Sequence, residues 1–502
     1  MGYSDFINRL VAGSAARDPE RPTSAARRTG AGSGQAGSAP HMQPYRGTSR
    51  QVCGLWPLVV GGSIPMVGAP LGRVLGGSGT LCADHISWFE KGLISAPSAM
   101  VLGLNGLGKS TLTRRIVLAH AYMGIYSMVL GDIKPDYVDL VRALGGQVIT
   151  IGHGRAGINP LDAGNVDEAV TLLEDHPSER DALLAAAHER KKNMVLSLIQ
   201  IMRRQPPSNR EEIVIDEAIR ILEKRGGQAV LADLLDLVRT APAELRMAAL
   251  DRGNMDHYRE VTEELEVSLM ALLSGRMGGI FAAETTTPMM MDRSVVFDVS
   301  SLIHEHSDLQ AAVLLSCWSY GFATVEIAQT LADAGVAPRR RYDLVMDELW
   351  RILEASSGMV ERVDSLTRLN RTIGIGQMMI THSMSDMDSL ASEEDRIKAR
   401  GFVERSKMLY LGGLPGRELP LLRGVMGFSN AEASLLTSWN APGTYDPFRG
   451  AAGIPAGMGK FMLKTSSAPG VPFQVDLAPG EADLSDTNKR WAAKHAAAER
   501  AA

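Results

Sequence analysis

A run of nine residues has the composition and spacing of a phosphate-binding loop, the motif G-x-x-x-x-G-K-[ST]. The run consists of Gly103, Leu104, Asn105, Gly106, Leu107, Gly108, Lys109, Ser110 and Thr111. The glycines let backbone N–H groups approach the β- and γ-phosphates of a nucleotide. Lys109 supplies a positive charge to the same oxygens, and Ser110 offers a hydroxyl to Mg²⁺. We therefore expect this segment, called the phosphate loop below, to bind a nucleotide.

An acidic pair, Asp347 and Glu348, directly follows the apolar run 342–346. At the carboxyl end of a sheet strand, the first acid can hold Mg²⁺ together with Ser110, and the second can polarise the attacking water. An Asp-Glu pair after a strand is also a common turn or helix start. The phosphate loop upstream favours the functional alternative, with Asp347 on the metal and Glu348 as the catalytic base.

Three further residues are candidates for contact with the γ-phosphate. His382 follows the apolar run 377–381, where nucleotide-driven motors often place a polar side chain that senses this phosphate. Arg371 and Arg405 are candidates for an arginine finger that reaches into a neighbouring subunit and stabilises transition-state charge. For each of them, a solvated surface position is the alternative.

Two other clusters favour a structural explanation. His304 and His306 could supply two metal ligands, but no partner set at ligand spacing accompanies them, which favours a loop. The basic run 339–341 offers a DNA contact through phosphates, with a solvated turn as the default.

Composition and charge limit the partners and the compartment. A formal net charge of -5 over 502 residues gives no global attraction to nucleic acid or to anionic lipid. Three scattered cysteines suit a reducing compartment. The N-terminus lacks the layout of a secretory signal, and the hydrophobic stretch 55–71 is interrupted by prolines and glycines. The sequence predicts a cytoplasmic protein.

Strand and helix signals alternate around these residues, which indicates a mainly parallel α/β sheet covered on both faces. Apolar runs predict strands at 99–102, 126–130, 147–151, 294–299, 342–346, 377–381, 408–411, 460–464 and 471–477. Helical spacing predicts helices after the phosphate loop and over 135–144 and 309–334. Strand signals vanish between about 167 and 273, where amphipathic helices dominate.

These patterns predict five regions along the chain. They are a disordered segment at 1–44, a small β-rich lead-in region at 45–97, a nucleotide-binding domain at 98–163 and 290–480, an all-helical insertion at 164–289, and a C-terminal tail at 481–502.

An ordered set of motifs resembles the conjugative type IV secretion traffic ATPases, within the HerA/FtsK-like class of hexameric motors. The set comprises the phosphate loop and residues 131–137 (GDIKPDY), 144–146 (LGG), 158–162 (INPLD), 295–298 (VVFD) and 346–351 (MDELWR). The resemblance runs from about residue 45 to residue 477. One departure is His382, where the family commonly has Gln.

The resemblance implies a RecA-like P-loop NTPase core that hydrolyses ATP with Mg²⁺ to power DNA or protein transfer or assembly of the apparatus. It also implies a homo-oligomer, a hexamer or a lower oligomer, that meets secretion apparatus proteins at the inner face of the cell membrane. Two alternatives remain open. One is a DNA-translocating coupling or segregation ATPase, and the other is a nucleotide-binding assembly subunit with incidental turnover.

Overall fold

The short apolar runs of the sequence form one sheet of 11 strands in the computed structural model. The structure describes residues 65–77, 79–354, 359–367, 375–390, 392–443, 445–446, 451–465, 468–478 and 480–481. All of them belong to one compact unit. The disordered segment expected at 1–44, the first part of the lead-in region and residues 482–502 of the expected tail lie outside the described residues.

The centre and one side of the sheet are parallel. In their order across the sheet, the parallel strands are β9 (Met408–Leu411), β3 (Ser98–Leu102), β8 (Gly376–Thr381), β7 (Arg341–Met346), β4 (Ile125–Asp132), β6 (Val295–Asp298) and β5 (Gln147–Thr150). Buried on both faces, these strands read as continuous apolar runs, which is why the sequence reveals them. The predicted α/β fold class with a mainly parallel sheet is confirmed.

Antiparallel strands extend the sheet beyond β9. They are β12 (Lys460–Lys464), β13 (Val471–Val475), β1 (Pro70–Val74) and β2 (Thr80–Cys82). The two strands expected near the C-terminus therefore pair with each other and join the main sheet. The described part of the lead-in region also contributes to this sheet, since β1 pairs with β13.

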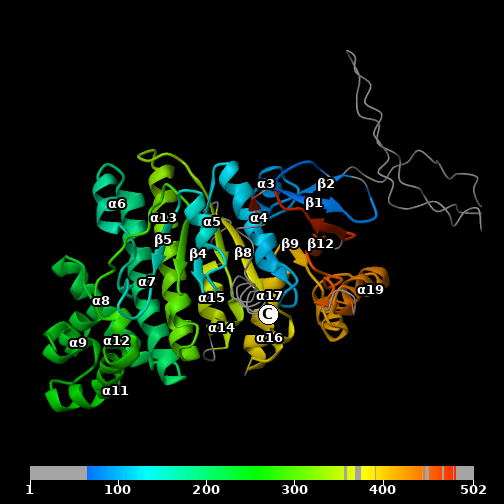
Figure 1. The fold of residues 1–502 in the computed structure, drawn as a ribbon. Helices are drawn as coiled ribbons and strands as arrows, with labels where there is room; N and C mark the ends of the chain where they lie inside the picture. The colour runs from blue at the N-terminus through cyan, green and yellow to red at the C-terminus, as the bar shows by residue number, and fades with distance from the viewer. Residues whose placement is uncertain are drawn as a thin grey trace, which may run out of the picture. The chain divides into compact units, whose positions relative to one another are not determined.

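Helices cover both faces of the sheet (Figure 1). On one face, α3 (His85–Glu90), α4 (Lys109–Tyr122) and α5 (Val138–Ala143) share a core with Val101 and Val129. On the other face, α13 (Ser307–Asp333) and α14 (Leu349–Leu353) share a core with Met100 and Met128. Neighbouring strand residues point to opposite faces, so each parallel strand supplies both cores.

Helix α13 is long and apolar enough to cross a membrane by length and composition. In this structure, 94% of its most apolar 18-residue stretch is buried inside the protein. Its neighbours include β4 and the long helix α7 (Pro177–Arg203). The core helix of a globular protein has the same composition, and the packing of α13 accounts for its hydrophobicity.

Only helices lie between β5 and β6. They are α6 (Val166–Leu172), α7, α8 (Asn209–Arg225), α9 (Leu231–Thr240), α10 (Ala243–Ala248), α11 (Met255–Leu273) and α12 (Gly275–Phe281). Figure 1 shows this group, in teal and green, beside the β5 edge of the sheet. The stripe Ile215, Ile219 and Leu222 of α8 is buried, as amphipathic spacing requires.

Short elements complete the described chain. They are η1 (Ser300–Leu302), α15 (Met359–Thr367), α16 (Ser385–Asp388), α17 (Glu393–Arg405), η2 (Gly416–Glu418), α18 (Leu419–Val425), α19 (Asn430–Ser438) and the strand pair β10 (Tyr445–Asp446) and β11 (Ala451–Ala452).

A buried network of two histidines and two aspartates joins α3, α4 and β7. Asp343 lies 2.8 Å from His85 Nε2 and 3.1 Å from His120 Nδ1. Asp84 lies 3.4 Å from His120 Nε2 and caps α3 through the amides of Ile86 and Ser87. All four ionisable side chains are fully buried. Buried charges are tolerated when they are paired, and this network ties the far end of α4 to β7.

The network predicts a loss of stability at alkaline pH. Burial alone would lower the pKa of His120, but Asp343 and Asp84 outweigh burial and raise the pKa to about 9. The stabilisation is therefore fully present below the ordinary histidine value of about 6.5 and is lost as the pH rises through about 9. We expect His120→Gln to destabilise the protein by about 3 kcal/mol at pH 6 and to flatten the fall in Tm between pH 7 and pH 10.

Thermal melts of both proteins across this pH range measure the effect. His304→Gln, at an exposed histidine, is the matched control and should melt like the wild type. Parallel pH profiles for the wild type and His120→Gln would contradict the assignment.

Candidate functional site

Three adjacent parallel strands end at the same edge of the sheet. The phosphate loop follows β3, His382 follows β8, and Asp347 follows β7, with β8 between the other two strands. The register pairs Leu102 with Thr381, so the loop and His382 leave the sheet at one level. Parallel pairing therefore brings together residues that are up to about 280 positions apart in the sequence. Such an edge is where open α/β sheets bind ligands.

The backbone of the phosphate loop is shaped to receive an anion. Gly108 has φ 99°, a left-handed conformation that suits glycine, and α4 begins directly after it with no side-chain cap. The first amides of α4 are therefore not taken by a side chain. The Gly459 amide donates to the Leu107 carbonyl at 2.9 Å and braces the loop from outside. A Cβ at Gly103 would lie 3.1 Å from the Gly412 Cα, so close packing also requires glycine there.

The Lys109 ammonium is bonded to the phosphate loop itself. Its ammonium donates to the Gly103 carbonyl at 2.6 Å and to Asn105 Oδ1 at 3.3 Å. Burial lowers the pKa of Lys109 to about 8, against the attraction of Asp347 and Glu348. Among the described residues no carboxylate forms an ion pair with this buried ammonium, and a phosphate would supply an anionic partner.

Asp347 is held in place by two donors. Its carboxylate accepts from the Tyr137 hydroxyl at 3.0 Å and from the Glu348 amide at 2.8 Å. Burial, with the neighbouring charge of Glu348, raises the pKa of Asp347 to about 6. A divalent cation would favour the ionised form, because it offsets both causes.

Glu348 adopts a left-handed backbone conformation at φ 53° and is the residue directly before α14. Its carboxylate accepts from Lys134 Nζ at 2.6 Å and from Trp350 Nε1 at 2.5 Å. Burial opposes ionisation, but the hydrogen bonds from His382 and Lys134 outweigh it and hold the pKa of Glu348 well below its usual range. Glu348 is therefore an ionised carboxylate at neutral pH.

His382 lies between the two halves of the site. Its Nε2 is 3.3 Å from Glu348 Oε2, and its carbonyl accepts from the Gly103 amide at 3.3 Å. The ring also lies beside Trp350, with centroids 6.1 Å apart. The structure thus brings together the phosphate loop, Asp347, Glu348 and His382, all of which the sequence singles out.

The turn after β4 adds residues to which the sequence analysis gives no role. Asp132 accepts from the amides of Asp136 and Tyr137, and burial raises its pKa to about 7. The neighbouring Ser110 hydroxyl favours the ionised form of Asp136, against the burial that raises the pKa of that carboxyl. Lys134 from the same turn reaches Glu348. The signal was present in the stretch 131–137, which directly follows a strand and belongs to the family motifs, but its contacts depend on β4 lying next to β7.

The candidate arginine fingers are not part of this chain's own site. Arg405 ends α17, pairs with Asp364, and accepts through its carbonyl from Ser98 at the start of β3. It therefore lies at the edge of the sheet opposite the phosphate loop, and a role in a neighbouring subunit stays a prediction. Arg371 lies outside the described residues. In the basic run 339–341, Arg339 pairs with Asp333.

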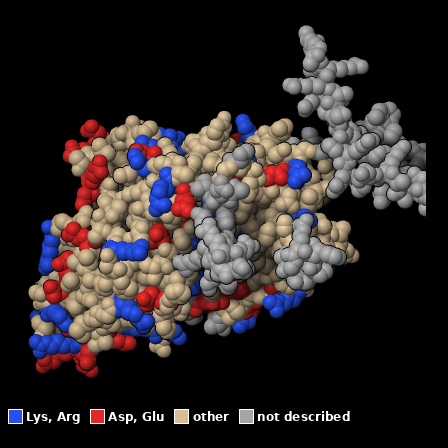
Figure 2. All heavy atoms as spheres, viewed as in Figure 1, with Lys and Arg blue, Asp and Glu red and all other residues tan. Residues whose placement is uncertain are grey.

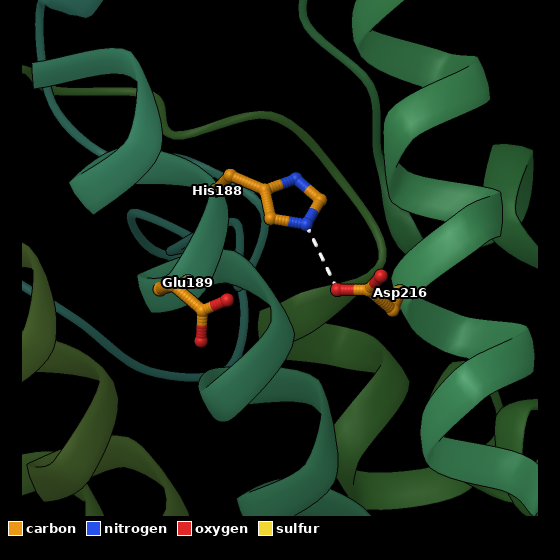
Figure 3. A group of neighbouring side chains, drawn as sticks. All are labelled: His188, Glu189 and Asp216. Atoms are coloured by element: carbon orange, nitrogen blue, oxygen red, sulfur yellow. Dashed lines mark hydrogen bonds and ion pairs between the residues drawn. The ribbon is translucent and has the colours of Figure 1, made fainter. Parts of the chain in front are cut away.

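One cluster elsewhere has the spacing of metal ligands. Within the described part of the chain, only His188, Glu189 and Asp216 bring three ligand atoms within 4.8 Å of one another, so residues 304–306 form no such group. Figure 3 shows the His188 ring on α7 directed toward Asp216 on α8. Lys192 contacts both carboxylates, and Arg220 contacts Asp216. These cations already neutralise the acids, so the cluster is an ion network between two helices.

Comparison with protein-family models and with curated proteins finds no match. Among solved structures, VirB4 of Thermoanaerobacter pseudethanolicus is similar, with a TM-score of 0.62 and 18% identity over 84% of this chain and 100% of that chain. This chain has the fold of VirB4. The plasmid coupling protein TrwB in complex with ADP and Mg²⁺ aligns with a TM-score of 0.47 and 13% identity, over 89% of this chain and 97% of that chain.

At 18% identity, the similarity to VirB4 establishes the fold alone. It confirms the P-loop fold that the sequence predicts. The chemistry of this VirB4-like fold has to be argued from its own residues.

The buried ammonium of Lys109 predicts opposite effects on binding and on stability. Lys109→Met should abolish detectable nucleotide binding, because the phosphates lose their buried cation. It should also raise the Tm of the nucleotide-free protein by a few degrees, since it removes a desolvated charge worth on the order of 1–2 kcal/mol. Fluorescent-nucleotide titration and thermal melts measure both effects. Lys91→Met, at an exposed lysine, should change neither, and a lower Tm for Lys109→Met would contradict the prediction.

Proposed function

We propose that this protein is a Mg²⁺-dependent ATPase that powers a conjugative or type IV secretion system, in DNA or protein transfer or in assembly of the apparatus. The observation that carries the proposal is the shared edge of the phosphate loop and Glu348, an ionised carboxylate held by His382 and Lys134. A base, a phosphate cradle and a buried cation in one place suit phosphoryl transfer to water. The family motifs and the VirB4-like fold support the choice of system.

The residues around Ser110 fit a magnesium ion. The Ser110 hydroxyl lies close enough to the Asp136 carboxylate to affect its pKa, and Asp347 follows β7, the strand beside β4. Hydroxyl and carboxylate oxygens are the hard ligands that Mg²⁺ prefers. Ser110 and Asp347 would hold the ion as the sequence predicts, and we add Asp136 as a further ligand, direct or through water. Bound Mg²⁺ would neutralise charge on the phosphates.

The chain's own groups account for the rest of the reaction. The amides of the phosphate loop and Lys109 bind the phosphate oxygens and hold them in line with the attacking water. Glu348 orients that water and takes its proton. His382 contacts both Glu348 and the backbone of the loop, so it can couple the position of the base to the binding of the phosphates.

The resemblance also leads us to propose partners and a location. We infer a homo-oligomer, a hexamer, that works in the cytoplasm at the inner face of the cell membrane against secretion apparatus proteins. Arg371 or Arg405 would then act as a finger on the site of a neighbouring subunit.

A DNA-translocating motor is the second candidate. On the face that Figure 2 shows, the described Lys and Arg side chains are interspersed with Asp and Glu. DNA binding depends on gathered positive charge, because phosphates dominate the affinity. Neither the mixed charge of this face nor the net charge of -5 of the whole chain supports tight DNA binding.

Replacement of the base tests the proposal. Glu348→Gln should reduce steady-state ATP hydrolysis by roughly 10²–10⁴-fold, since a neutral amide cannot take the proton, while ATP binding persists. Phosphate release by purified protein, with and without single- and double-stranded DNA, measures the rate. Glu354→Gln is the matched control, because Glu354 directly follows α14 but accepts a hydrogen bond from Ser389, and this variant should hydrolyse ATP normally.

Each alternative has its own outcome in this assay. Hydrolysis that needs Glu348 and ignores DNA supports the secretion ATPase. Stimulation of several-fold by DNA would favour the translocase. ATP-dependent oligomers that survive Glu348→Gln, with transfer unaffected, would favour an assembly subunit with incidental turnover.

The proposed magnesium ligands predict a second effect. Asp136→Asn and Asp347→Asn should each raise the Mg²⁺ concentration needed for half-maximal nucleotide binding by about tenfold, because a neutral amide is a weaker ligand than a carboxylate. Titration of Mg²⁺ at fixed fluorescent nucleotide measures this. Asp139→Asn, at an exposed position on α5, should leave the Mg²⁺ requirement unchanged. An unchanged requirement in Asp136→Asn would remove that residue from the metal site.

A further inference from the structure

Both oxygens of the Glu348 carboxylate are engaged by protein donors. Oε1 accepts from Lys134 Nζ at 2.6 Å. Oε2 accepts from Trp350 Nε1 at 2.5 Å and lies 3.3 Å from His382 Nε2. A general base must reach the attacking water with an available oxygen. In this arrangement Oε1, the oxygen that contacts neither Trp350 nor His382, is held by an ammonium.

Of the three donors, Lys134 is the one free to leave. Trp350 is two residues from Glu348 on the same chain segment, and His382 is fixed at the end of β8. Lys134 sits on the turn after β4, and 44% of its side chain is exposed. Its flexible four-carbon stem can redirect the ammonium at little cost. The turn itself is anchored separately, through the amides that bind Asp132.

Lys134 also lies near the phosphate loop. Its charge acts on the ammonium of Lys109, which lies inside the phosphate loop. Two cations that face one space repel each other until an anion lies between them. The γ-phosphate carries more negative charge than a carboxylate, so it can compete with Glu348 for Lys134.

We propose that the Lys134 ammonium exchanges Glu348 for the γ-phosphate when a nucleoside triphosphate binds. The exchange releases Oε1 of Glu348 for the attacking water, while Trp350 and His382 keep Oε2 in place. Loss of the γ-phosphate returns Lys134 to Glu348 and shuts off the base. A diphosphate leaves the pair intact. The inference rests on the proposed ATPase function and explains how the site distinguishes the two nucleotides.

Nucleotide affinities test the exchange without relying on turnover. Lys134→Gln should raise the Kd of a non-hydrolysable ATP analogue by about tenfold and leave the Kd of ADP within about twofold. Lys134→Arg keeps the charge and should retain most of the preference for the triphosphate. Lys398→Gln is the matched control, because Lys398 pairs with Glu361 and Glu394 on the surface of α17 and should not affect either affinity.

A second variant separates exchange from simple attraction. Glu348→Gln removes the competitor for Lys134, so the ATP analogue should bind several-fold more tightly than in the wild type, with ADP unchanged. In the double variant Lys134→Gln/Glu348→Gln this gain should disappear. If the gain persists without Lys134, removal of a negative charge near the phosphate explains it and the exchange is wrong.

The same measurements keep the two proposals apart. Wild-type protein that binds neither nucleotide would refute the proposed ATPase. Wild-type protein that binds and hydrolyses ATP, with equal losses of ATP analogue and ADP affinity in Lys134→Gln, would overturn the exchange alone. Thermal melts of each variant confirm that the affinities refer to folded protein.

Discussion

The parallel pairing of β3, β8 and β7 is the constraint on which the site depends. Each strand ends at the same edge, so the phosphate loop, His382 and Glu348 meet although the chain separates them widely. The hydrogen bond from the Gly103 amide to the His382 carbonyl fixes two of these strand ends to each other. The placement of these groups therefore follows from the sheet, while α4 adds its first amides, Lys109 and Ser110 to the same edge.

Charge at this edge is arranged for a ligand that is itself strongly charged. Asp132, Asp136 and Asp347 have raised pKa values because burial disfavours their ionised forms, and Lys109 has a lowered one for the same reason. A protein without a charged ligand gains nothing from such an arrangement, since each group pays desolvation. Phosphates beside Lys109 would stabilise its positive charge, and a divalent cation beside the three aspartates would stabilise their negative charges. Perturbed groups of this kind mark functional sites in general.

Much of this organisation could be predicted from the sequence, because buried parallel strands read as apolar runs. The strand 408–411 is found with its observed bounds, and the motif positions of Lys109, Asp347 and Glu348 locate the site. The turn after β4 could not be given its role, because its contacts cross from one strand to a neighbour more than 200 residues later. Residue type alone also could not give the position of Arg405. Its charge suits a finger, but the fold places it beside Ser98 at the far edge.

Strand β7 contributes to both groups of buried charges, the candidate site and the histidine–aspartate network. Its carboxyl end leads into Asp347 and Glu348, while Asp343 in its middle is buried against His85 and His120. His120 belongs to α4, the helix that begins at the phosphate loop. The ion network thus locks the helix of the loop to the strand of the base on the side away from the nucleotide. Lys134 has no such anchor: its side chain is 44% exposed, so under the proposed exchange it is the group that responds to the phosphates.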